Sequence, residues 1–295
     1  MGYLYEYGTA FTKSLKKNID IQLERVENKR ASMIIIDGAV GTGKTTLAVE
    51  VMDYINSKTG KDKVILNTKE HPQLALGGKE FIGCFNKCYK EGYKVLTYDE
   101  GGDFSRRGAI TKLNRTLNRA FETYRGFKIL VIICLPNFAI LDNLLFDNEI
   151  PRLLVHITDR GKYQGDYFLY SLSQMNWLRY WFNKLNIATR KKAFKYVLPN
   201  SKGHFKNLPP AREKELDKLS TAGKSKVWKE TEIQLEGLYS YKDLAKALNI
   251  THQYVRIKVN RLKVKPVRVI DRVKYFDKSI FDKLNDNLRK DKNNR

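Results

Sequence analysis

Apolar residues along the first part of the chain gather in short continuous runs, separated by stretches in which they recur every three or four positions. Short runs bounded by turn residues are typical of strands buried on both faces, and the wider spacing is typical of helices. The runs occupy positions 33–36, 63–67, 94–100, 128–137 and 152–157. Helical spacing follows at 44–55, 80–89 and 110–124. Strands that alternate with helices predict an α/β fold with a parallel sheet covered on both faces.

Three segments around this pattern have their own character. Residues 1–31 are polar with interspersed aromatic side chains, and they predict an N-terminal helix that packs on the main domain. Residues 159–172 predict a hairpin that turns near Gly161 and Gly165. Residues 184–230 hold thirteen Lys and Arg against four Asp and Glu, and three prolines and Gly223 interrupt the stretch. This composition predicts a partly ordered basic linker.

The last fifth of the chain has a different pattern. Ser240 and Thr251 each precede a short stretch with helical spacing, and Asn249 stands at the turn between the two stretches. Ser and Thr are good helix caps, and two short helices joined by a tight turn form a helix-turn-helix. Residues 265–277 then predict a hairpin, and a closing helix follows. We expect three parts: an α/β domain over 1–183, a linker over 184–230 and a helix-turn-helix domain over 231–295.

A glycine-rich loop, GAVGTGKTT over 38–46, joins the first apolar run to the helical stretch after it and fits the pattern Gly-x4-Gly-Lys-Ser/Thr. Glycine accepts positive φ, so successive N–H groups can point inward and bind anionic oxygens beside the positive end of the following helix. The lysine can reach the β- and γ-phosphates and the threonine hydroxyl can ligate Mg²⁺. A glycine-rich surface turn could match by accident, but the strand before and the helix after favour a phosphate-binding loop. We expect ATP to be bound by Gly38, Gly41, Thr42, Gly43, Lys44, Thr45 and Thr46.

An acidic pair closes the third apolar run. Asp99 would lie at the carboxyl end of its strand, where parallel sheets bind ligands, and would hold Mg²⁺ together with Thr45. Glu100 is suited to orient or deprotonate an attacking water. An ordinary acidic turn is the alternative, which the upstream loop disfavours. We therefore predict ATP hydrolysis, with Lys44, Asp99 and Glu100 as catalytic residues.

These motifs resemble the P-loop ATPases with an additional catalytic glutamate, the RecA-like and AAA-like class. The resemblance implies a sheet of order 5-1-4-3-2, with the Asp-Glu pair on the third strand. It also implies nucleotide-sensing roles for two asparagines. Asn67 would restrain the catalytic glutamate from the end of the second strand, and Asn137 would sense the γ-phosphate just past the fourth. Either asparagine could instead cap its strand.

The same resemblance implies a ring, in which an arginine completes the neighbouring subunit's site by stabilising charge on the transferred phosphoryl group. Arg125, at the end of the helix that enters the fourth strand, matches that place, and we count it among the catalytic residues. Arg106 and Arg107 are rival candidates, and a surface arginine without a special role is the plain alternative. More loosely, residues 94–172 are similar to the HerA/FtsK and Zot-like ATPases of viruses and mobile elements. They depart from many of these in having CLPN where a Thr-Gln or Ser-Gln dipeptide is common.

Charge completes the picture. The 295 residues carry a formal net charge of +23, which indicates a polyanionic partner, nucleic acid first and an anionic membrane surface second. The last part of the chain resembles the winged helix domains of MerR-like and excisionase-like proteins, and residues 251–268 hold basic residues without an acidic one. Such a helix suits DNA phosphates, and residues near its start could reach base edges. A winged helix used for protein contacts, or a plain solvated basic face, is the alternative. The expected DNA contacts are His252, Gln253, Arg256, Lys258, Arg261, Lys263 and Lys265, with Arg268 in the same stretch.

The cysteines and the apolar runs of the sequence bear on the cellular compartment that we expect. Cys84, Cys88 and Cys134 form no disulfide framework, and the first two, one helical turn apart, indicate packing rather than a zinc site. The longest apolar run is too short to span a bilayer, and no signal peptide opens the chain. We expect a cytoplasmic protein without a membrane partner, in the host cytoplasm if it is viral.

These observations predict an ATP-driven DNA motor, a translocase or genome-packaging-type ATPase from a virus or mobile element. It would act as a homo-oligomeric ring that docks on DNA through the winged helix, with virion or replication proteins as possible partners. An ATP-switched DNA-binding regulator or helicase loader, without translocation, is the second interpretation. A nucleotide or metabolite kinase is the third, and the Asp-Glu pair, basic linker and winged helix disfavour it.

Overall fold

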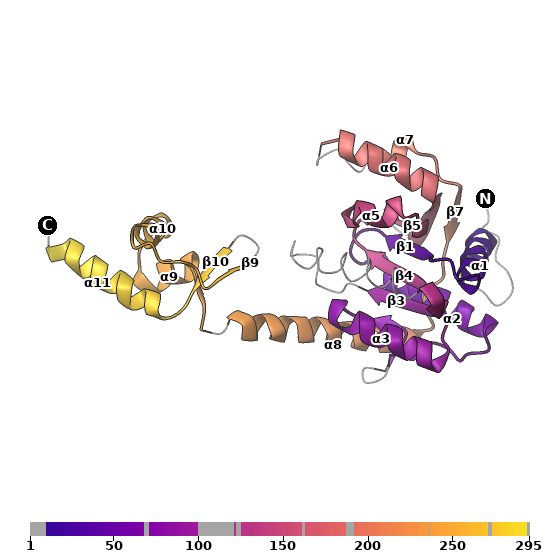
Figure 1. The fold of residues 1–295 in the computed structure, drawn as a ribbon, viewed down its shortest axis with the longest axis horizontal. Coiled ribbons are helices and arrows are strands. Elements are labelled where there is room, and N and C mark those ends of the chain that lie inside the picture. Colours follow the sequence, from indigo (N-terminus) through magenta and orange to yellow (C-terminus); the bar gives the residue numbers. More distant parts are fainter. Residues whose placement is uncertain are drawn as a thin grey trace. The chain divides into compact units, whose positions relative to one another are not determined.

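The computed structural model describes residues 10–67, 71–99, 121, 125–160, 163–186, 192–235, 237–270 and 273–293. They belong to two compact units, one that ends at Lys224 and one that starts at Ser225 (Figure 1). The first unit therefore extends well past the expected boundary at residue 183. Each unit is described by itself below.

A seven-stranded sheet forms the centre of the first unit, in the order β2-β3-β4-β1-β5-β6-β7. The strands are β1 Met33–Asp37, β2 Leu74–Ala75, β3 Val95–Asp99, β4 Leu130–Leu135, β5 Pro151–Arg160, β6 Tyr163–Ser171 and β7 Ser201–His204. The first five strands are parallel to their neighbours, which confirms the predicted order 5-1-4-3-2. The predicted hairpin is the antiparallel pair of β5 and β6.

The second strand is not where the sequence predicted it. In segment 63–67, Val64 and Leu66 are buried and Ile65 is exposed, which is the alternation of a strand. However, the backbone of Val64 bonds to side chains instead of to a neighbouring strand. Its N–H donates to Asp53 and its carbonyl accepts from Arg212. The second strand is instead the two-residue β2, which is too short to give an apolar pattern.

Helices cover both faces of the sheet, as predicted. On one face lie α1 Lys13–Glu27, α2 Lys44–Lys58 and buried leucines from the early turns of α8 Pro210–Leu235. On the other lie α3 Gly78–Glu91, α5 Asn143–Asp147, α6 Leu172–Lys184 and α7 Ala193–Tyr196. Alternate residues of β1 enter opposite cores, Met33 and Ile35 on the second face, Ile34 and Ile36 on the first. Two short 3-10 helices, η2 Arg125–Phe127 and η3 Phe138–Ile140, flank β4.

Segment 184–230, expected to be a linker, is largely built into the first unit. Its strand β7 pairs with β6, and α8 buries Leu216 and Leu219 in the core on the first face of the sheet. A polar strand such as Ser-Lys-Gly-His leaves no apolar pattern, which is why the sequence did not reveal it. Residues 187–191 of this segment, and most of the helix expected at 110–124, lie outside the described residues.

The second unit contains the predicted pair of short helices, α9 Tyr241–Leu248 and α10 His252–Arg261. Ser240 and Thr251 cap them through their hydroxyl oxygens, and Asn249 takes the left-handed conformation (φ 49°) at the turn. Three short strands pair in the order β8-β10-β9, and a longer helix closes the unit. These elements are β8 Tyr239–Ser240, β9 Arg268–Ile270, β10 Val273–Phe276 and α11 Ser279–Asn293.

Candidate functional site

The glycine-rich loop lies between β1 and α2, at the carboxyl edge of the parallel strands. Gly38, Gly41 and Gly43 all have positive φ, at 152°, 82° and 82°. A Cβ added to Gly38 would lie 2.6 Å from the carbonyl oxygen of Ile157 in β5. The loop therefore needs glycine both for its backbone conformation and for its close approach to the neighbouring strand. Such a loop can present its N–H groups to phosphate oxygens beside the start of α2.

Lys44 and Thr45 follow the loop and connect it to β3. The Lys44 ammonium donates to the carbonyl oxygens of Gly38 (3.0 Å) and Ala39 (2.6 Å). Burial lowers the pKa of Lys44, and negative groups nearby, including Asp99, act in the opposite direction. The Thr45 hydroxyl donates to Asp99 Oδ2 at 2.8 Å, although the two residues are 54 positions apart.

The Thr45–Asp99 contact fits the metal that a nucleotide brings. A hydroxyl and a carboxylate are hard oxygen donors, which Mg²⁺ prefers, and Asp99 is buried at the end of β3. Because the loop glycines have positive φ, the loop can point its N–H groups toward the phosphates that accompany the metal. The described residues therefore suit a magnesium–nucleotide complex.

A second carboxylate lies beneath the loop, and the sequence analysis did not single it out. Asp37, the last residue of β1, accepts hydrogen bonds from the backbone N–H of Phe138 at 3.0 Å. Its other oxygen contacts His156 Nδ1 of β5 at 2.7 Å. The His156 ring stacks on Phe194 of α7, with ring centres 3.8 Å apart. One buried carboxylate thus joins the ends of β1 and β5 to the turn after β4. An acidic residue that closes an apolar run was the available signal.

The two predicted sensor asparagines have different surroundings. Asn137 follows β4 at the same edge as Asp99, and its side chain caps η3 by accepting from the N–H of Ala139. It therefore has the strand-end position and a capping bond as well. Asn67 is exposed in segment 63–67, which is not a strand, so Asn67 does not end the second strand as predicted.

Several predicted residues fall outside what the structure describes. Glu100, Arg106 and Arg107 lie outside the described residues, and so does the side chain of Arg125, whose backbone begins η2. Cys84 and Cys88 are described, and both are buried in α3. Burial raises the pKa of Cys84 to about 11, consistent with a packed thiol. Among the described residues no group of three His, Cys, Asp or Glu could hold a metal ion, and no helix could cross a bilayer.

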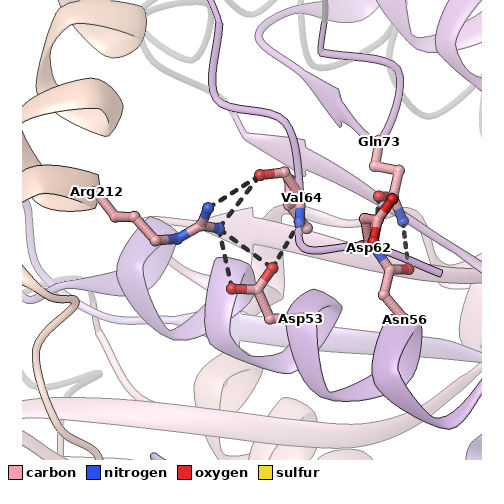
Figure 2. Close-up of polar contacts among 6 residues, drawn as sticks. All are labelled: Asp53, Asn56, Asp62, Val64, Gln73 and Arg212. Carbon is pink, nitrogen blue, oxygen red and sulfur yellow. Dashed lines mark hydrogen bonds and ion pairs between the residues drawn. The ribbon is translucent and has the colours of Figure 1, made fainter. Parts of the chain in front are cut away.

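An ion pair connects α8 to α2, the helix that begins at the loop. Figure 2 shows the Arg212 guanidinium pointing toward Asp53 and toward the carbonyl of Val64. Arg212 reaches Asp53 Oδ2 at 2.9 Å, and both side chains are largely buried. Burial raises the pKa of Asp53, while the Val64 N–H and Arg212 act to lower it. On the same helix, Asn56 exchanges two amide hydrogen bonds with Gln73, just before β2. Nothing in the linear pattern linked these residues.

In the second unit, the residues expected to contact DNA differ in their exposure. His252, Gln253, Arg256, Arg261, Lys263 and Lys265 are exposed. Lys258 is a correction, because its side chain is buried, with 5% exposed. It lies one helical turn after the buried Val255, so it faces the core, where its ammonium donates to Asn287 of α11 at 3.0 Å. A cleft of about 460 Å³ lies beside α10. Its lining includes Tyr241, Lys242, His252, Arg256, Lys274 and Tyr275.

The order of the parallel strands, the positive-φ glycine loop between β1 and α2, and the bond from Thr45 to Asp99 at the end of β3 together decide the fold. The chain has the P-loop NTPase fold. No protein-family model matches the sequence, and a search of curated proteins found no match.

Among solved structures, the chain is similar to the N-terminal domain of zonular occludens toxin from Neisseria meningitidis, at 15% identity and a TM-score of 0.36, covering 61% of this chain and 95% of that one. It is also similar to domain III of the replication initiation protein DnaA from Thermotoga maritima, at 16% identity and a TM-score of 0.31, covering 60% and 74%. TM-scores this low carry no argument, so the P-loop NTPase assignment depends on the sheet order and the loop.

Proposed function

We propose that this protein is an ATP-hydrolysing DNA motor, a translocase or genome-packaging-type ATPase, that docks on DNA through its C-terminal unit. The observation that carries the proposal is the 2.8 Å bond between the Thr45 hydroxyl and Asp99. It joins, from separate elements, the two residues that would hold the magnesium of a bound nucleotide, Thr45 at the start of α2 and Asp99 at the end of β3. A glycine loop alone would indicate nucleotide binding, whereas the acidic strand end beside it supports hydrolysis.

In this proposal the residues have distinct roles. The N–H groups of the loop bind the phosphates, and Lys44 exchanges its two loop carbonyls for phosphate oxygens. Thr45 and Asp99 would hold Mg²⁺, which when bound neutralises charge on the phosphates. Glu100, directly after Asp99, would orient or deprotonate the attacking water, and Arg125 of a neighbouring subunit would stabilise the transferred phosphoryl group. Asn137 follows β4 at the same edge and would sense the γ-phosphate.

The proposed DNA contact is a winged helix. Two features of the second unit support it: a short pair of capped helices with a tight turn, and the strands β9 and β10 that follow as a hairpin. The exposed residues of α10 and the segment after it include Arg256, Arg261 and Lys265, and basic side chains on an exposed helix suit phosphate contacts. In a viral or mobile-element setting, virion or replication proteins would be the further partners.

The deciding experiment measures ATP turnover alone, with double-stranded DNA and with single-stranded DNA, alongside the oligomeric state by light scattering. The proposal expects DNA-stimulated turnover by an oligomer, and Lys44→Ala serves as the inactive control. Movement along DNA is then tested by displacement of a third strand from a duplex. Stimulated turnover without displacement would favour the ATP-switched regulator or helicase loader. Absence of any turnover above the Lys44→Ala control would refute the ATPase.

A further inference from the structure

Helix α6 has an exposed face that combines aromatic and polar residues without an aliphatic one. Its buried positions are Met175, Leu178 and Phe182, which face the sheet. The opposite face, at helical spacing, consists of Ser173, Asn176, Trp177, Tyr180, Asn183 and Lys184. Trp177 is 60% exposed and Tyr180 43% exposed. Large aromatic side chains with this much exposure on a helix are typical of a binding surface.

Neighbouring rings extend the surface onto α7. Trp177 contacts Tyr180 edge-on, with ring centres 5.7 Å apart, and Tyr180 contacts Trp181 in the same way. Trp181 in turn stacks on Tyr196 of α7 at 4.5 Å, and more than half of the Tyr196 side chain is exposed. The Lys184 ammonium lies 4.7 Å from the centre of the Tyr180 ring. We call these five residues the α6–α7 aromatic surface.

The two helices that bear this surface contain only basic charged residues, although Asp142 and Asp147 of the neighbouring segment lie near Arg179 of α6. From residue 167 to residue 206 the chain has eight Lys and Arg and no Asp or Glu. Lys184 lies at the Tyr180 ring and Lys195 is exposed on α7, so the surface presents cations that attract polyanions. Charge complementarity therefore points to an anionic partner.

We propose that the α6–α7 aromatic surface binds single-stranded nucleic acid by stacking bases on its rings while Lys184 contacts the phosphates. Every base has a flat face that can stack on an aromatic ring, and a cation beside the ring meets the backbone. An anionic lipid surface shares the charge, and Trp and Tyr also favour membrane interfaces. A helix that lies in a membrane, however, buries a broad apolar face, whereas the exposed face of α6 interleaves its rings with serine and asparagine. Binding of a nucleic-acid strand to this surface does not depend on the proposed function. Only the further statement that this strand is the motor's substrate rests on it.

The two helices that bear the surface contact the candidate nucleotide site from their buried side. Phe194 of α7 stacks on His156, and His156 contacts Asp37, the residue before Gly38. Phe194 also packs against Phe182 of α6, on the buried side of the same helix. The helices that would hold a strand are thus linked to the start of the phosphate loop through Phe194, His156 and Asp37.

The test is fluorescence anisotropy of a labelled oligodeoxythymidine with the full-length protein, in the absence of nucleotide. The double variant Trp177→Ala/Tyr180→Ala should lose affinity by roughly 30-fold or more, because each of the two lost rings removes a stacking partner worth roughly 5- to 100-fold. Trp177→Phe/Tyr180→Phe keeps two rings and should bind close to wild type. Tyr89→Ala, which removes an exposed tyrosine from α3, is the matched control and should leave binding unchanged.

Direct contact has its own readout, because oligodeoxythymidine should quench wild-type tryptophan fluorescence and quench the Trp177→Phe variant less. Equal affinity of the double alanine variant and wild type would overturn the proposal. Loss of binding to phosphatidylglycerol vesicles, with oligonucleotide binding intact, would reassign the surface to membranes and overturn it as well. A wild-type protein that binds the oligonucleotide but never hydrolyses ATP would refute the motor and leave this surface standing.

Discussion

Removing either partner of the Arg212–Asp53 ion pair should destabilise the first unit strongly. Arg212 makes two contacts to the Asp53 carboxylate and two to the carbonyl of Val64. Asp53 accepts a further bond from the Val64 N–H at 2.7 Å. The side chains are 18% and 13% exposed, so water replaces few of these bonds when a partner is removed.

The expected cost follows from that burial. Breaking a fully buried pair costs about 3–5 kcal/mol, because the remaining charge is left without its partner. Partial exposure reduces this, and we expect about 2–4 kcal/mol for Arg212→Ala or Asp53→Ala. The double variant should cost less than the sum of the two, with a coupling energy of about 1–3 kcal/mol, because the second truncation removes the stranded charge.

Urea unfolding at neutral pH measures these costs. A Trp228→Phe background leaves Trp177 and Trp181 as the reporters, and both lie in the first unit. Lys58→Ala is the control on the same helix, because Lys58 pairs with Asp20 at the same 2.9 Å but with 43% and 33% exposure. An exposed pair should cost about 0–1 kcal/mol. If Arg212→Ala destabilised no more than Lys58→Ala, the reasoning from burial would be wrong.

The remaining predictions concern the candidate sites. Lys44→Ala should abolish ATP turnover and weaken nucleotide binding in a titration, because it removes the cation beside the loop. Glu100→Gln should bind nucleotide yet hydrolyse it at least about 100-fold more slowly in a steady-state assay; normal hydrolysis would exclude a catalytic glutamate there. Arg125→Ala should be inactive alone but regain activity when mixed with Glu100→Gln subunits, and failure to complement in an exchanging oligomer would count against a trans role. Charge reversal of Arg256 and Arg261 should lower DNA affinity and flatten its salt dependence while basal turnover persists; an unchanged salt slope would move the DNA contact elsewhere.

The sequence predicted the parts of the fold in which burial dictates the residue pattern. The runs that became β1 and β4 are buried on both faces, so they had to be continuously apolar. The phosphate loop was predictable because its glycines serve a local backbone need. The helix caps of the second unit were predictable for the same reason, because Ser240 and Thr251 accept hydrogen bonds from the first turns of the helices that they precede.

The sequence-based predictions were wrong where a side chain from a distant part of the chain determined the local structure. Segment 63–67 alternates like a strand, but Asp53 and Arg212 take up the hydrogen bonds of Val64. The sequence predicted Lys258 to be an exposed cation, but the packing of α10 directs its side chain toward Asn287. Asp37 gave only a weak signal, because its partners lie in β5 and after β4, more than 100 positions away. No linear pattern encodes such pairings.

The edges of the seven-stranded sheet constrain how copies of this protein can join. One edge strand, β2, has two residues, and the other, β7, has four and carries the exposed Lys202. Just past β7, Phe205 already forms a bridge with Phe11 of the same chain. Short and charged edges resist the addition of a strand from another molecule. Any ring would therefore be joined through helices and loops, so that neighbours could shift against one another during turnover without breaking a shared backbone ladder.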